Sequence, residues 1–228
     1  MIHTLFSRCP SHGSGRERRT MFLTRSGIKR LMQNAYKGGG LRIRNDGQGI
    51  SISGSSWAVY FLAGEIPKES LGDLISMVGE LPERGESYTA DKNGNQMEIW
   101  DDAWQNAMEI AGSGGEDLEI TPVVVEGFPY FMRILQDCNM QITLIDERMK
   151  QIVQPSLIDS DDDETLPDGP MLCTGNIIGT TVHTICWTNN RMAFCVLPII
   201  THDENIIEII RGLENMPLWG IKTLEGDT

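Results

Sequence analysis

The chain of 228 residues is 40% hydrophobic and 22% charged, a composition typical of a globular protein with one large domain or two of about a hundred residues each. It lacks a run of about 18 apolar residues, which excludes a hydrophobic membrane-spanning helix, and its five cysteines form no close pairs, which favours a reducing compartment such as the cytoplasm. The net charge is −13, yet residues 1–44 hold ten of the nineteen Lys and Arg and a single acid, Glu17.

Residues 1–20 show no helical or strand periodicity and are rich in Ser, Gly and Arg. We expect them to be a disordered leader, or to precede a true start at Met21. Cys9 and His12 have the spacing of half a zinc site, but no second pair with matching spacing follows, so we predict no metal there.

Residues 21–111 have the pattern of an α+β half. Apolar residues at helical spacing predict a helix over residues 28–36, with Lys29, Arg30 and Lys37 on its opposite face. Alternation predicts strands at 41–44, 50–53 and 57–62, a helix beginning at Pro67, a hairpin over 88–100 and a short helix capped by Asp101 or Asp102. On the first of these strands Arg42 and Arg44 share the outer face.

Residues 112–117 are rich in Gly and are predicted to be a linker to a second α+β half, residues 118–228. There the pattern predicts an edge strand at 120–125, a helix from Pro129 to Cys138, a hairpin over 140–153, strands at 171–178, 181–187 and 192–197, and a final helix behind a capping box from Thr201 to Glu204. The fold class is therefore α+β, antiparallel sheets with packed helices, and the pattern allows two similar helix, strand, helix halves.

No motif for catalysis, cofactors or metals accompanies these elements. The acidic loop 159–170 has Glu164 and Pro170 where an EF-hand needs Gly and Glu, and Cys186 and His183 fall on opposite faces of one strand. No nucleophile elbow or phosphate-binding loop occurs. We predict no cofactor and no metal, and we place an enzyme third among the alternatives, with a pocket at His183 or His202 as its best support.

Six basic residues of the first helix and strand form the predicted contact surface for nucleic acid: Arg25, Lys29, Arg30, Lys37, Arg42 and Arg44. Over residues 27–213 the arrangement resembles DNA sliding-clamp-like proteins, which are acidic and present basic helices to DNA. This resemblance implies a non-enzymatic protein that contacts DNA or RNA. The short predicted elements separated by glycines are similar to those of phage or mobile-element accessory proteins.

The alternative function uses the acidic body. Clustered carboxylates can imitate phosphates and occupy the basic groove of a nucleic-acid-handling enzyme, as in an inhibitor or adaptor of the anti-defence type. Trp219 is a further candidate for a partner surface because it lies near the chain end among polar residues. The residues predicted to contact a basic protein partner are Asp161, Asp162, Asp163, Glu164 and Trp219.

Overall fold

The computed structural model describes residues 21–98, 105–157, 166–177 and 180–219. In this part of the chain the elements, in order, are α1 (Arg25–Gly38), β1 (Leu41–Asn45), β2 (Gly49–Ser53), β3 (Trp57–Leu62), α2 (Lys68–Val78), β4 (Glu86–Asp91), β5 (Gly94–Met97), α3 (Ala107–Gly112), β6 (Gly115–Asp117), β7 (Glu119–Gly127), β8 (Tyr130–Gln136), β9 (Ile142–Asp146), α4 (Glu147–Lys150), the 3-10 helix η1 (Pro155–Leu157), β10 (Asp168–Ile177), β11 (Thr180–Thr188), β12 (Met192–Val196) and α5 (Glu204–Leu213). None of these helices is long and apolar enough to cross a membrane.

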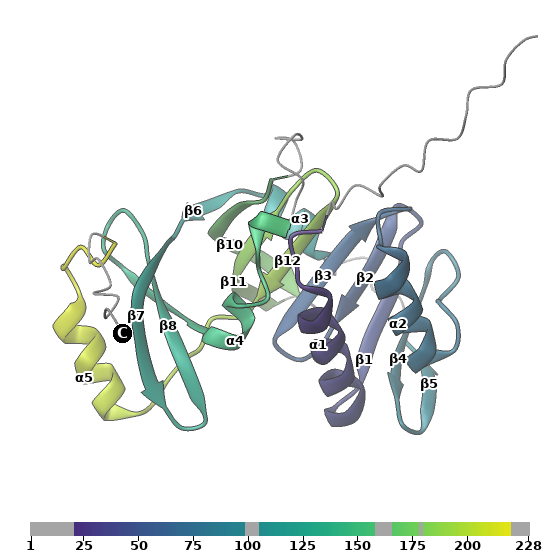
Figure 1. Ribbon diagram of the computed structural model, residues 1–228, viewed down its shortest axis with the longest axis horizontal. Coiled ribbons are helices and arrows are strands. Elements are labelled where there is room, and N and C mark those ends of the chain that lie inside the picture. Colours follow the sequence, from purple (N-terminus) through teal and green to yellow (C-terminus); the bar gives the residue numbers. More distant parts are fainter. Residues whose placement is uncertain (1–20, 99–104, 158–165, 178–179, 220–228) are drawn as a thin grey trace, which may run out of the picture.

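Nine of the strands form one antiparallel sheet in the order β5-β4-β1-β2-β3-β12-β11-β10-β6, and β7-β8-β9 form a second. Figure 1 shows the two sheets as two lobes, with β6 and β7 running between them. The α+β class and the antiparallel sheets are confirmed. The large sheet combines strands from both predicted halves through the β3–β12 pair, and residues 112–117, predicted as a linker, end α3 and form β6.

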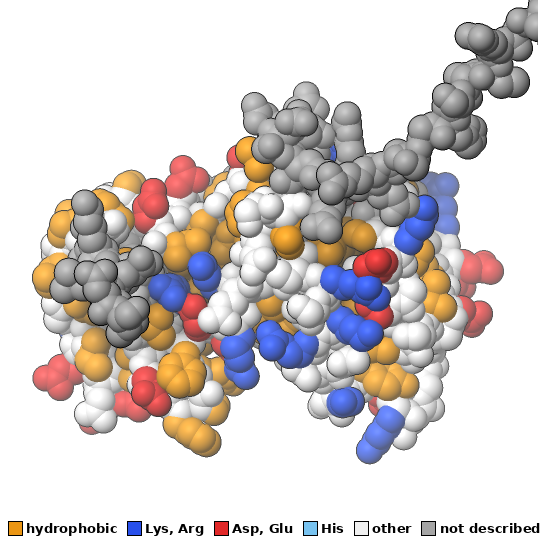
Figure 2. All heavy atoms as spheres, in the orientation of Figure 1, with side chains coloured by type: hydrophobic (Ala, Val, Ile, Leu, Met, Phe, Trp, Pro, Cys, Tyr) orange, Lys and Arg blue, Asp and Glu red, His pale blue; other side chains and the backbone are white. Residues whose placement is uncertain are grey.

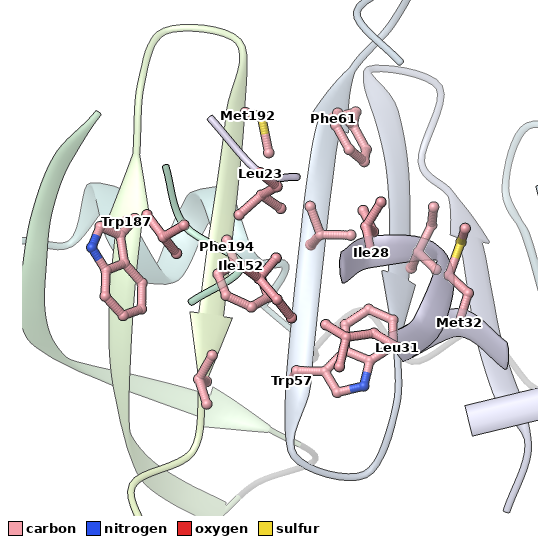
Figure 3. Close-up of a cluster of buried hydrophobic side chains, with 14 of the residues drawn as sticks. Leu23, Ile28, Leu31, Met32, Trp57, Phe61, Ile152, Trp187, Met192 and Phe194 are labelled. Carbon is pink, nitrogen blue, oxygen red and sulfur yellow. The ribbon is translucent and has the colours of Figure 1, made fainter. Parts of the chain in front are cut away.

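The main core lies between α1 and the large sheet (Figure 3). On β1, Leu41 and Ile43 are buried and alternate with the exposed Arg42, as the predicted pattern requires. Trp187 and Phe194, partners on β11 and β12, stack with ring centroids 6.1 Å apart. Every residue of β12 is buried because α3 covers the face of the sheet opposite this core.

The same core joins the two sheets. Leu135 of β8, Ile145 of β9 and Ile152 pack into the cluster that contains α1 and the large sheet. Gly27 permits this contact: a Cβ there would lie 2.7 Å from a side-chain carbon of Ile152. The segment that follows α4 is therefore held directly against the first turn of α1, and the backbone N–H of Thr24 donates to the carbonyl of Ile152 at 2.9 Å.

The predicted helix from Pro129 is wrong, because residues 130–136 form strand β8. Both faces of β8 are covered: Leu135 enters the main core, while Met132 and Ile134 pack with Ile206 of α5. A strand buried on both faces has neighbouring apolar residues instead of alternating ones, and such a run also fits helical spacing. The second half thus opens with strands, so the predicted match to the first half is lost at this element.

Two smaller predictions are also wrong. The hairpin over 140–153 has β9 as its first strand, but the chain then turns into α4, where the Asp146 carboxylate accepts from the backbone N–H of Arg148 at 2.9 Å. Helix α5 is capped by Asp203, whose carboxylate accepts from the backbone N–H of Asn205, and not by Thr201. Asp203 stands one residue before the helix, where a short acceptor side chain reaches the free N–H groups directly.

Candidate nucleic-acid interface

Two adjoining hollows lie between the exposed side of α1 and the segment around α4. The first, about 680 Å³, has Arg30, Arg42 and Arg148 in its wall together with Trp57 and the glycines that end α1. The second, about 430 Å³, shares Arg30 and Ile152 with the first and adds Lys150. We call the two together the basic groove. No Asp or Glu of the described residues lines either hollow, although the protein carries 32 acids.

The view in Figure 2 shows this charge arrangement. Lys and Arg side chains border the hollow between the two lobes, whereas acidic side chains lie mostly toward the outer edges of this face. The positive potentials of four cations around one concave surface add together, so this surface attracts an anion. The groove is therefore a positive site on a negative protein.

The four cations differ in how much of their charge is already compensated. Arg30 and Lys150 have no ion-pair partner among the described residues. Arg42 lies 3.3 Å from the Glu98 carboxylate, and Arg148 lies 2.6 Å from that of Asp146. Both of these arginines are more than half exposed, and the Arg42 pair is a weak surface pair. Arg148 donates through Nε and Nη2 to the buried Asp146 carboxylate, so its charge is partly compensated and its Nη1 is the group that can donate to an incoming anion.

Two predicted contact residues, Arg25 and Lys29, point to a different neighbour. Arg25 donates to the Asp73 carboxylate at 2.9 Å and pairs with Glu69 at 2.6 Å, while Lys29 donates to Asp73 at 2.7 Å. These bonds fasten α1 to α2. The hydrogen bond from Arg25, and then that from Lys29, hold the pKa of the Asp73 carboxyl below its usual range. Neither cation lines the basic groove.

This cluster predicts a pH dependence. Because the pKa of Asp73 is lowered on folding, its contribution to stability is present above the unfolded pKa and disappears as the pH falls below about 4. Asp73→Ala should lower the free energy of unfolding by about 1 kcal/mol at pH 7, a modest value because both cations are partly exposed. Urea denaturation at neutral and acidic pH measures this, with the exposed Glu208→Ala as control. An equal loss at pH 7 and pH 3 would contradict the role of the ion pairs.

Of the remaining four predicted cations, two line the basic groove and two lie outside both the groove and the Asp73 cluster. Arg30 and Arg42 line the basic groove, Lys37 is exposed in the last turn of α1, and Arg44 is half-buried on β1, outside both hollows. Arg148 and Lys150 were missed because their segment was predicted to be a turn and a strand. The signal available in the sequence was two basic residues, two positions apart, immediately after a buried strand.

Of the residues predicted to contact a basic protein partner, the structure describes only Trp219. Asp161, Asp162, Asp163 and Glu164 lie outside the described residues. Trp219 is 43% exposed, and its neighbour Leu218 is fully buried, with its backbone N–H donating to the Gln136 side chain at 2.9 Å. The chain before Trp219 therefore folds back on β8.

The cysteines and histidine are separated as expected. Cys186 is buried beside Cys195, with a sulfur–sulfur distance of 2.7 Å, and Cys173 packs in the same cluster under α3. His183 is exposed, with Nδ1 3.3 Å from the Thr174 hydroxyl. The hydrogen bond with Cys173 lowers the pKa of the Cys186 thiol, but the hydrogen bond with Cys195 and burial outweigh it, so the pKa is raised. Within the described ranges no group of three His, Cys, Asp or Glu has the arrangement of a metal site.

No family model and no curated protein sequence matches this chain. Among solved structures, the chain is similar to the crystal structure of a protein provisionally named DNA polymerase III beta subunit, from Eubacterium rectale ATCC 33656. The identity is 7% and the TM-score 0.31, with 82% of this chain and 67% of that chain covered. This similarity of fold is weak.

Proposed function

We propose that this protein is a non-enzymatic nucleic-acid-binding protein that holds the phosphate backbone in the basic groove. The observation that carries the proposal is the lining of the groove: it includes Arg30, Arg42, Arg148 and Lys150 and no Asp or Glu of the described residues, because the carboxylates that pair with Arg42 and Arg148 lie outside it. Phosphate contacts by Lys and Arg provide most of the sequence-independent affinity for nucleic acid. The acidic remainder of the surface would repel the polymer and so restrict its contact to the groove.

The rigid placement of the cations also supports binding. Arg30 comes from α1 and Arg42 from β1, while Arg148 and Lys150 come from α4, so three elements fixed to one core supply the charges. The backbone positions that carry the cations are therefore set before binding, so the ligand does not have to order them. A clamp-like contact and a place among cytoplasmic phage or mobile-element accessory proteins are the finer parts of this proposal, and they rest on the sequence.

The direct test reverses two charges of the groove. Arg30→Glu/Lys150→Glu should weaken binding of a fluorescein-labelled oligonucleotide by more than about tenfold at about 100 mM salt, because two phosphate contacts become repulsive. Fluorescence anisotropy measures the affinity for single-stranded and duplex DNA and RNA.

The matched control is Lys92→Glu/Arg211→Glu, which changes the net charge equally at two exposed positions outside the groove. It should bind as the wild type does, apart from a small long-range charge effect. If the wild type binds no nucleic acid at low salt, or if both double variants lose affinity equally, the groove is not the binding site. Capture of a basic protein through residues 161–164 would then favour the alternative of an acidic inhibitor or adaptor.

A further inference from the structure

The hairpin between β7 and β8 exposes aromatic side chains that no packing requirement explains. Phe128 at its tip is fully exposed, Phe131 is 56% exposed and Tyr130 is 42% exposed. Large aromatic residues are normally buried, and a cluster of exposed ones on a soluble surface marks a contact site. In Figure 1 this hairpin tip and the end of α1 lie at the same side of the molecule, one on each lobe.

The aromatic tip is linked directly to the basic groove. The guanidinium carbon of Arg148 lies 5.7 Å from the centre of the Tyr130 ring, within the range of a cation–π contact. Arg148 is also a wall residue of the larger hollow. A ligand held by the groove cations therefore reaches the Tyr130 ring directly, and Figure 2 shows hydrophobic side chains beside Lys and Arg along this border.

Charge decides which part of a nucleic acid fits the tip. Glu126 is the cross-strand neighbour of Phe131 and is exposed, so a phosphate placed there would meet a carboxylate. A base carries no net charge and has a flat face that stacks on an aromatic ring. The groove thus suits the backbone and the tip suits unpaired bases.

We infer that the ligand is single-stranded nucleic acid, with its phosphates in the basic groove and its bases stacked on exposed rings of the hairpin: Tyr130 beside Arg148, and Phe128 and Phe131 farther from the groove, since Phe131 lies on the opposite strand face. This inference rests on the proposed function. In a duplex the base faces are covered by their neighbours in the stack, so the tip has nothing to contact and only the phosphate contacts remain. The protein should therefore bind a single strand more tightly than a duplex of equal length.

The test removes the aromatic rings and leaves the cations in place. Tyr130→Ala/Phe131→Ala should weaken binding of a labelled oligo-dT by about tenfold and leave the affinity for a duplex of equal length unchanged. Met97→Ala/Ile200→Ala is the matched control, since it removes two exposed apolar side chains elsewhere and should bind oligo-dT as the wild type does. Tyr130→Phe keeps a ring and should also retain wild-type affinity.

The outcomes separate this inference from the proposed function. Equal affinity of the wild type for the single strand and the duplex, or an equal loss on both in Tyr130→Ala/Phe131→Ala, would overturn the inference and leave the groove intact. Binding to neither would overturn both. Concentration-dependent dimerisation of the wild type, abolished in the same variant, together with unchanged oligo-dT binding, would instead assign the tip to contact between copies of the chain.

Discussion

Trp187→Ala should lower the free energy of unfolding by about 3–5 kcal/mol, the range for removing a buried tryptophan from a core. Trp187 is 2% exposed, packs with its cross-strand neighbour Phe194 and belongs to the cluster that includes residues of both sheets. Its removal leaves a cavity beside β11, where the neighbouring strands β10 and β12 hold the backbone in place. Guanidinium denaturation followed by far-ultraviolet circular dichroism measures the change, because tryptophan fluorescence would itself be altered.

Trp219→Ala is the matched control for this prediction. It deletes the same side chain at a position that is 43% exposed, so the loss should be below about 1 kcal/mol. Losses of equal size in the two variants would contradict the packing described for β11 and β12. An unchanged stability in Trp187→Ala would do the same.

Salt should weaken binding to a single strand by about 50-fold between about 50 and about 200 mM. Four phosphate contacts, from Arg30, Arg42, Arg148 and Lys150, release about 0.7 counterion each on single-stranded nucleic acid, which gives a slope of about −3 in a plot of log affinity against log salt. Anisotropy titrations at several salt concentrations measure the slope directly.

The same plot tests which residues make the contacts. Arg30→Ala/Lys150→Ala should reduce the slope by about half, whereas Lys92→Ala/Arg211→Ala should leave it unchanged. A wild-type slope near zero would contradict binding through phosphate. A slope that stays at about −3 without Arg30 and Lys150 would move the contacts to other cations, such as Lys37.

Local patterns predicted much of the large sheet. The alternation of Leu41 and Ile43 with Arg42 fixes which face of β1 is buried, and the helical spacing from Ile28 onward fixes the buried side of α1. These elements have one buried face each, so their periodicity is clear. At β8 the opposite holds, because Leu135 and Ile134 enter different cores and their neighbouring positions imitate a helix.

The candidate site was only partly predictable for a different reason. The sequence marked a basic helix and strand, but it could not distinguish Arg30 from Arg25, which differ in their neighbours and not in type. Arg25 is paired because α2 places Asp73 and Glu69 beside it, a contact across more than forty residues. Arg30 remains open because the segment after α4 lies along the other side of α1.

The sequence by itself determined the α+β class, the strong acidity of the protein and a basic segment at the start of its patterned region, since composition and local periodicity specify these directly. Tertiary structure decided the rest. It joined strands from both parts of the chain in one sheet, combined Arg30 and Arg42 with Arg148 and Lys150, and placed the aromatic hairpin tip beside them. These are long-range contacts, and which elements pack together depends on the shared core around Ile152, Leu135 and α1.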